Sequence, residues 1–308
     1  MGSFSTTRIL LVALVIVLLA SFLPLGVSGY ILGLLTLAYY FGVFAMAWDL
    51  LFGFAGEVNF GPTFLIGTGA YTAGILDNLY QPPIWLCLVA GALAAVVGGV
   101  VLALPALRVR GPYFGLTTLV AVLILQNFIV VDASLTGGEI GLTVPDVISI
   151  SDAVNYEIAL WFMAVSGAIL FVLSRSPVGL ILQASGQDAV QAGALGFNVT
   201  KHKLTAFIIS AFFSGLAGGL LVFYLGSASV GTLIDITVGV QIIIAAVLGG
   251  RRTILGAVLG ALFLIAMSEA LRPLGDLSNF VVFAMALIVV LLFPGGFFGL
   301  LTKSKEPS

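Results

Sequence analysis

The contrast that decides the fold is between long hydrophobic runs and one polar segment, Arg175-SPVGLILQASGQDAVQAGALGFNVTKH-Lys203. Hydrophobic residues make up 61% of the chain and charged residues 8%, against about 45–50% and about 25% in soluble domains. Several of the hydrophobic runs approach the ~20 residues needed to cross a bilayer core. Because a helix satisfies its own backbone groups in lipid, these runs are expected to be α-helical. The sequence therefore predicts an all-α polytopic membrane protein.

The hydrophobic runs define about ten transmembrane helices. Their approximate bounds are 9–28, 31–53, 59–77, 84–107, 113–131, 158–174, 205–226, 235–250, 253–272 and 279–297. The first run follows Arg8 and has the composition of a signal peptide. Further spans follow it directly and no clear cleavage site is present, so we expect an uncleaved first helix. A β-barrel is not indicated, because no alternating segments of about ten residues occur.

Ten spans divide into two sets of five, and an odd number in each set would invert the second set relative to the first. The third span of each set is unusual, since 59–77 is rich in Gly and Thr and 235–250 is barely long enough to cross. Paired short or glycine-interrupted spans are typical of inverted repeats with a substrate route between them. We therefore hypothesise two inverted five-helix halves.

The basic residues orient these spans in the membrane. An N-terminus in the cytoplasm places ten of them inside: Arg8, Arg108, Arg110, Arg175, Lys201, Lys203, Arg251, Arg252, Lys303 and Lys305. Only Arg272 then lies outside, and the opposite orientation would reverse this bias. The loop 132–157, which is acidic and has no Lys or Arg, is accordingly expected outside. The polar segment 175–204 and both termini, residues 1–8 and 298–308, are expected in the cytoplasm.

Capping signals predict two short helices in the polar segment. Ser176 is an N-cap followed by Pro177 at the first helical position. A second helix is predicted from Ser185, with Asp188 at N3 in a variant of the capping box, to a C′ glycine at Gly196. Between these caps lie the small residues Ala189, Ala192, Gly193 and Ala194. Such a smooth surface suits docking into a partner's groove, although an ordinary capped loop helix would show the same spacing.

The sequence of this segment resembles a known family. Ser176-Pro-Val-Gly179 and Ala192-Gly-Ala-Leu195-Gly196-Phe-Asn198-Val-Thr200 are similar to the cytoplasmic coupling loop of ABC-importer permeases for branched-chain amino acids, the LivM type. Further motifs follow in the family's order: Leu51-Phe-Gly53-Phe-Ala-Gly56-Glu-Val-Asn59-Phe-Gly61, Ile66-Gly-Thr-Gly69-Ala-Tyr71, Arg110-Gly111-Pro-Tyr113-Phe114, Leu135-Thr136-Gly137-Gly138, Leu248-Gly249-Gly250 and Phe293-Pro294-Gly295-Gly296. The chain also departs from the pattern, with Pro62 in place of a frequent His and with Leu180, Gln183 and Gly186 in place of basic residues.

The resemblance implies that residues 1–308 form a single permease domain that works with other subunits. These are a second homologous permease, two ABC ATPase subunits and an extracytoplasmic solute-binding protein, in the cytoplasmic membrane of a prokaryote. The implied ATPase-coupling residues are Ser185, Asp188, Ala189, Ala192, Gly193, Leu195, Gly196 and Asn198. The binding protein is expected on the side of Thr136, Gly137 and Gly138. The resemblance implies import of branched-chain or other hydrophobic amino acids.

The sequence contains no constellation of catalytic or metal-binding residues. The one histidine, His202, stands between two lysines on the polar segment, and no phosphate-binding loop G-x-x-x-x-G-K-[ST] occurs. We therefore expect a transport subunit rather than an enzyme, with no cofactor or metal and no nucleic-acid partner. ATP and magnesium would be bound by the partner ATPases.

Polar side chains within the spans are the candidates for the translocation path, because buried charges are costly in a membrane. They are Asp49, Glu57, Asn59, Gln126, Asn127 and Gln241. Four of them have a structural alternative: Asp49 as a hydrogen-bonded acid at the interface, and Gln126, Asn127 and Gln241 as contacts between helices. Two further functions stay open. The same architecture could carry urea, short amides or a sugar, and a self-contained secondary transporter would need mid-membrane carboxylates, to which only Asp49 comes near. A non-transporting scaffold would leave the coupling loop without a purpose.

Overall fold

The structure is a computed structural model that describes residues 6–107, 112–275, 277–292 and 296. Arg108, Arg110, the motif residues 293–295 and the expected cytoplasmic tail 298–308 lie outside the described residues. The elements, in chain order, are α1 (Thr6–Ala20), α2 (Gly29–Asp49), a π-helical turn (Leu50–Phe54), α3 (Pro62–Tyr80), α4 (Ile84–Ala106), α5 (Pro112–Val131), α6 (Ala133–Thr136), β1 (Leu142–Thr143), α7 (Asp152–Arg175), α8 (Pro177–Gln187), α9 (Ala189–Ala194), α10 (Val199–Leu225), β2 (Ser227–Ala228), α11 (Val230–Leu233), α12 (Ile236–Gly249), α13 (Leu255–Leu271) and α14 (Leu277–Leu292), with 3-10 turns at Leu23–Leu25 and Arg272–Leu274.

The prediction of an all-α polytopic membrane protein is confirmed. Each of the ten predicted spans contains one long helix, namely α1 to α5, α7, α10 and α12 to α14. Among the described residues, eight helical segments are long and apolar enough to cross a membrane. α3, which is richer in polar residues, is not one of the eight, and α12 reaches the required length only together with α11.

Two helices form the centre of the bundle. α10 packs on α3 and α4, while α2 packs on α7, α12 and α13. Glycines allow the backbones around α10 to come into contact: a Cβ at Gly91 would lie 2.5 Å from the carbonyl oxygen of Gly69, and a Cβ at Gly218 would lie 2.5 Å from that of Ile66. Close backbone approach of this kind stabilises helix pairs in lipid, where van der Waals packing replaces the hydrophobic effect.

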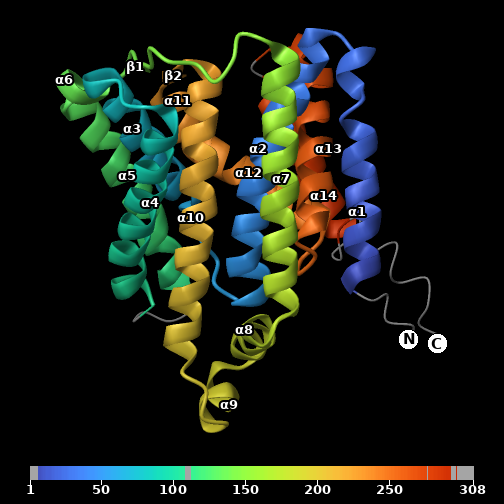
Figure 1. Cartoon of the computed structure of the whole chain (residues 1–308). Coiled ribbons are helices and arrows are strands. Elements are labelled where there is room, and N and C mark those ends of the chain that lie inside the picture. Colours follow the sequence, from blue (N-terminus) through green and yellow to red (C-terminus); the bar gives the residue numbers. More distant parts are fainter. Residues whose placement is uncertain (1–5, 108–111, 276, 293–295, 297–308) are drawn as a thin grey trace.

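The helix contacts support the hypothesis of inverted halves, but over four helices rather than five. α2 contacts α12 and α13, as α10 contacts α3 and α4, and the pairs α3–α4 and α12–α13 also correspond. In the same way, α5 packs on α3 and α4, and α14 packs on α12 and α13. α2 and α10 run in opposite directions (Figure 1). Each is followed by a segment that begins and ends with glycine, Gly56-Glu-Val-Asn-Phe-Gly61 and Gly226-Ser-Ala-Ser-Val-Gly231, and the first glycines have φ of 74° and 67°. The first helix of each predicted half does not correspond, since α7 packs on α2 whereas α1 packs mainly on α7.

Polar structure gathers at the two ends of the bundle (Figure 1). At one end, β1 and β2 pair antiparallel with Leu142 opposite Ala228, which ties the loop 132–157 to the end of α10. At the other end, α8 and α9 project beyond the long helices, with α9 the furthest from the bundle. α1 begins at this second end. The fold therefore places the loop 132–157 and the segment 175–204 at opposite ends, as the charge pattern predicts.

Candidate coupling site

Two capped helices form the projecting segment. The Ser176 hydroxyl accepts a hydrogen bond from the backbone N–H of Gly179 at 3.4 Å, with Pro177 at N1, which confirms the first predicted cap. α9 ends in a Schellman motif: the N–H of Phe197 donates to the carbonyl of Ala192, and that of Gly196 to the carbonyl of Gly193. Gly196 has φ of 91° and is the predicted C′ glycine.

The predicted start of the second helix is wrong by three residues. Ser185 lies inside α8 and is buried, so it caps nothing. The N-cap is Asp188, whose Oδ1 accepts hydrogen bonds of 2.9 Å from the N–H groups of both Val190 and Gln191. Asp188 has an extended backbone (φ −149°, ψ 101°) and is the first residue that departs from helical geometry. α8 therefore continues to Gln187.

The outer surface of α9 is apolar and exposed. Val190 and Leu195 are 77% and 76% exposed, Phe197 is partly exposed, and a Cβ on Gly193 would meet no atom within 4 Å. We name these four residues the α9 tip. Exposed large apolar side chains on so small an element make the α9 tip a candidate contact surface. Of the predicted coupling residues, Ala189, Gly193, Leu195, Gly196 and Asn198 are also exposed.

Ala192 belongs to the inner side of α9. It is only 2% exposed, so it contacts the rest of the segment and not a partner. The sequence does not show that Ala192 faces inward, and the resemblance implied it as a coupling residue. Val190 and Phe197 are exposed apolar residues of this segment that sequence reasoning missed. The sequence could have indicated these two residues, because they are large and apolar in an otherwise polar segment.

A glycine contact joins this segment to the membrane bundle. Gly186 of α8 lies against the loop that follows the π-helical turn, where a Cβ on Gly56 would be 2.8 Å from the Gly186 carbonyl oxygen. The neighbouring Glu57 forms an ion pair of 2.5 Å with Lys203 near the start of α10. Both side chains are largely buried, so loss of either partner would leave a poorly solvated charge. These contacts connect α8 and the start of α10 to the loop 55–61.

We expect Gly186→Ala and Gly193→Ala to have opposite effects, although both add one methyl group to the same segment. The new Cβ at position 186 would lie 2.5 Å from the carbonyl oxygen of Phe54 and 2.9 Å from the N–H nitrogen of Gly56. These are backbone atoms, so overpacking should destabilise the contact by about 1–3 kcal/mol. Gly193→Ala meets open space and should stabilise α9 by roughly 0.5–1 kcal/mol. Limited proteolysis of the segment 175–203 measures both, and equal cleavage rates would contradict the proposed contact.

Asp49 joins α2 to the turn before α13. Its Oδ1 accepts from the N–H of Arg252 at 3.0 Å, and its Oδ2 accepts from those of Thr253 and Ile254 at 3.1 Å each. Arg252 and Ile254 have φ of 64° and 34°, which is unfavourable for residues with a side chain, above all for a β-branched one. The geometry gives Asp49 a structural role, because its carboxylate on α2 fixes the turn between α12 and α13.

The remaining path candidates make contacts within and between elements. Asn59 is buried, accepts from the Trp48 indole N–H through its carbonyl at 2.6 Å, and caps Gly61 through its side chain. The Gln126 amide donates to the carbonyl of Ile234 before α12, whereas Asn127 donates to Leu123 of its own helix. Gln241 is half-buried in α12. The structure does not bring these amides together with Asp49 into one cluster, and a role in translocation stays a prediction.

At the opposite end of the bundle, the loop 132–157 is held by hydrogen bonds. The Thr136 hydroxyl donates to the carbonyl of Ile129 and accepts from the N–H of Gly138, while Gly137 and Gly138 have φ of 75° and 59°. Asp77 of α3 accepts from the N–H of Asp146 at 3.1 Å. Ile140 and Ile150 are almost fully exposed on this loop. The loop 132–157 is thus held in place by hydrogen bonds while presenting acidic and apolar side chains.

The described part of the chain is therefore a multi-pass helical membrane protein with a short projecting helix at one end. Comparison with known proteins adds the family: the description "Branched-chain amino acid transport system / permease component" matches residues 30–292. The chain belongs to this family, and it is a membrane permease. This confirms the resemblance recognised in the sequence.

Individual relatives agree with the family. The chain is 26% identical to the permease protein LivM of a high-affinity branched-chain amino acid transport system of Salmonella typhimurium, over 96% of this chain and 76% of that protein. It is 26% identical to the permease protein LivH of the corresponding Escherichia coli system, over 86% of this chain and 92% of that protein. It is 28% identical to the ribose import permease RbsC of Haemophilus influenzae, over 43% of each chain. No solved structure matches significantly.

Proposed function

We propose that the chain imports branched-chain or other hydrophobic amino acids across a prokaryotic cytoplasmic membrane as one permease subunit of an ATP-driven importer. The observation that carries this proposal is the α9 tip, an exposed apolar surface on a capped helix that contacts the bundle through Gly186 and Gly56. Two cytoplasmic ATPases, each with ATP and magnesium, would dock on this surface and on the equivalent one of a second permease. The similarity to both LivM and LivH supports such a paired permease.

The charge distribution supports an orientation with both termini and α9 in the cytoplasm. Arg175, Arg251 and Lys203 lie at the α9 end, whereas Arg272 is the one basic residue at the end of the loop 132–157 among the residues described. The exposed acids of that loop include Glu139, Asp146 and Asp152. An acidic outer surface would attract a binding protein with basic residues on its docking face and accelerate its association.

Purification from native membranes tests this function. We expect an ATPase chain and a second permease to co-purify with this chain, and the reconstituted complex to take up leucine only with ATP and the binding protein. Uptake without any ATPase would instead support a secondary transporter. Partial similarity to a ribose permease favours a sugar as the second candidate substrate. Calorimetry of the associated binding protein with leucine, ribose and urea distinguishes these substrates.

A further inference from the structure

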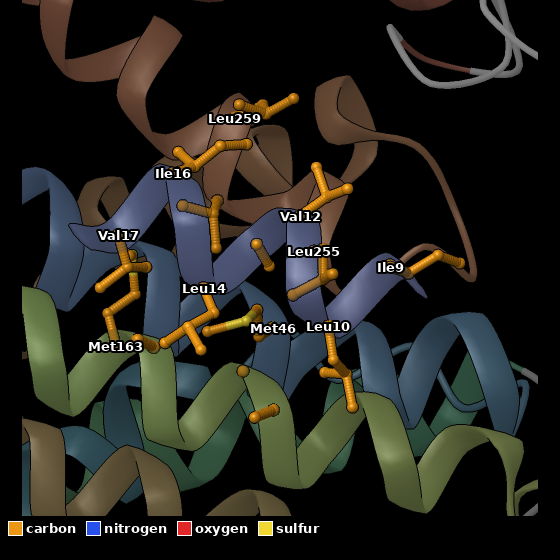
Figure 2. Close-up of a pocket in the computed structure, with 15 residues that line it drawn as sticks. Ile9, Leu10, Val12, Leu14, Ile16, Val17, Met46, Met163, Leu255 and Leu259 are labelled. Carbon is orange, nitrogen blue, oxygen red and sulfur yellow. The ribbon is translucent and has the colours of Figure 1, made fainter. Parts of the chain in front are cut away.

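An apolar groove lies between α1 and the wall formed by α2, α7 and α13. Its volume is about 480 Å³, within the range of about 300–1,000 Å³ that small-molecule sites occupy. Figure 2 shows side chains of α1, such as Leu10, Leu14 and Val17, facing Met46, Met163 and Leu255 across it. Every side chain of the lining is aliphatic or a methionine. Such a cavity offers no partner for the hydrogen bonds of water, and no group that would hold a zwitterionic substrate.

α1 covers this groove loosely. Val17 is its one buried residue, and the rim residues Val12 and Ile16 are mostly exposed. The far end of α1 is fixed, because the Tyr156 hydroxyl donates to the carbonyl of Ala20 at 2.9 Å. α1 also precedes residues 30–292, which match the permease family. An empty groove would deprive its lining atoms of dispersion contacts, so a flexible apolar occupant would stabilise it.

Basic side chains stand where the groove reaches the α9 end of the bundle. Arg8 is exposed and directly precedes Ile9, which lines the groove. Arg251 is exposed four residues before the lining residue Leu255, with its guanidinium 4.6 Å from the ring centre of Phe52. Each basic residue near a membrane surface attracts anionic lipid by about 1 kcal/mol. The combination of an aliphatic groove and basic residues at its end matches the acyl chain and headgroup of a phospholipid.

We propose that this groove binds one acyl chain of an anionic phospholipid, with the phosphate near Arg8 and Arg251. The bilayer is as apolar as the groove, so the hydrophobic effect does not drive binding. Affinity instead comes from packing in the groove and from the headgroup charge. The bound chain would pack between α1 and the residues Met46 and Leu255. Met46 lies three residues before Asp49 on α2, and Leu255 directly follows the turn 252–254 that Asp49 binds. This site does not depend on what the permease carries.

Photo-crosslinking tests the site with the full-length protein in nanodiscs of phosphatidylglycerol and phosphatidylethanolamine. Phosphatidylglycerol with a diazirine in its acyl chain should label α1 and residues 163–168 of α7. Ala168→Phe fills the groove and should reduce this labelling at least about tenfold, which corresponds to 1.4 kcal/mol. Val165→Phe is the matched control, since Val165 is exposed on α7 and does not line the groove. It should label like the wild type.

Two further variants make the test decisive. Ala13→Phe fills the groove from α1, so a loss of labelling in both variants excludes misfolding of α7 as the cause. Arg8→Gln should keep the acyl labelling but lower the preference for phosphatidylglycerol over phosphatidylethanolamine. Labelling that is unchanged by both groove-filling variants would overturn the proposal. So would wild-type protein whose α1 and residues 163–168 are not labelled by the phosphatidylglycerol probe, because the groove would then hold no acyl chain.

Discussion

Asp49→Ala is expected to destabilise the protein by at least about 3 kcal/mol, because three backbone N–H groups would lose their acceptor and each unsatisfied buried donor costs about 1–3 kcal/mol. These groups belong to Arg252, Thr253 and Ile254, and they form a turn whose unusual φ angles depend on the carboxylate. The thermal unfolding midpoint of the detergent-solubilised protein measures the loss. Transport should fall in parallel with the amount of folded protein.

Asp49→Asn separates this structural role from a gate in the translocation path. Asparagine keeps one acceptor oxygen, so it can still bind Thr253 and Ile254 and should lose about 1 kcal/mol. Glu139→Gln is the control, because it removes a carboxylate that is exposed on the loop 132–157. A fully stable Asp49→Asn protein that does not transport would contradict the structural role and favour the gate.

Leu195→Asp is expected to abolish docking of the ATPase while leaving the membrane protein folded. Leu195 is 76% exposed and contributes little to the fold, so its apolar surface is available to a partner. An apolar anchor in an interface carries about 2 kcal/mol or more, which is roughly a 30-fold loss of affinity. Val190→Asp should act in the same way. Co-purification of the ATPase and the unfolding midpoint are the two measurements.

Thr200→Asp is the matched control for docking. It introduces the same charge on an exposed residue in the first turn of α10, outside the α9 tip. Acidic residues are favourable at a helix N-terminus, so this variant should stay folded. Ala192→Arg is unsuitable as a test, since a buried alanine cannot accept arginine without disrupting α9. Equal ATPase binding by Leu195→Asp and Thr200→Asp would place the docking surface elsewhere.

The sequence predicted features that depend on neighbouring residues. The long apolar runs became helices, and Ser176 and Gly196 became helix caps, because capping and membrane insertion are decided within a few residues of the chain. The sequence does not specify where α9 starts, because Ser185 and Asp188 are both favourable N-cap residues. In the structure α8 continues to Gln187, which leaves Asp188 as the N-cap. The sequence motifs also indicated the permease family, which the comparison confirmed.

By itself, then, the sequence determined that this is a helical membrane permease with a polar, capped segment between its hydrophobic helices. Only the tertiary structure decided what the individual polar and small residues do. Asp49 binds the backbone of a turn more than 200 positions away in the sequence. Position 186 must be glycine because the backbone of Gly56 leaves no room for a side chain there. Ala192 points inward through the rotation of one short helix. Such roles depend on contacts between distant segments and on helix rotation, which local patterns of hydrophobicity and charge do not specify.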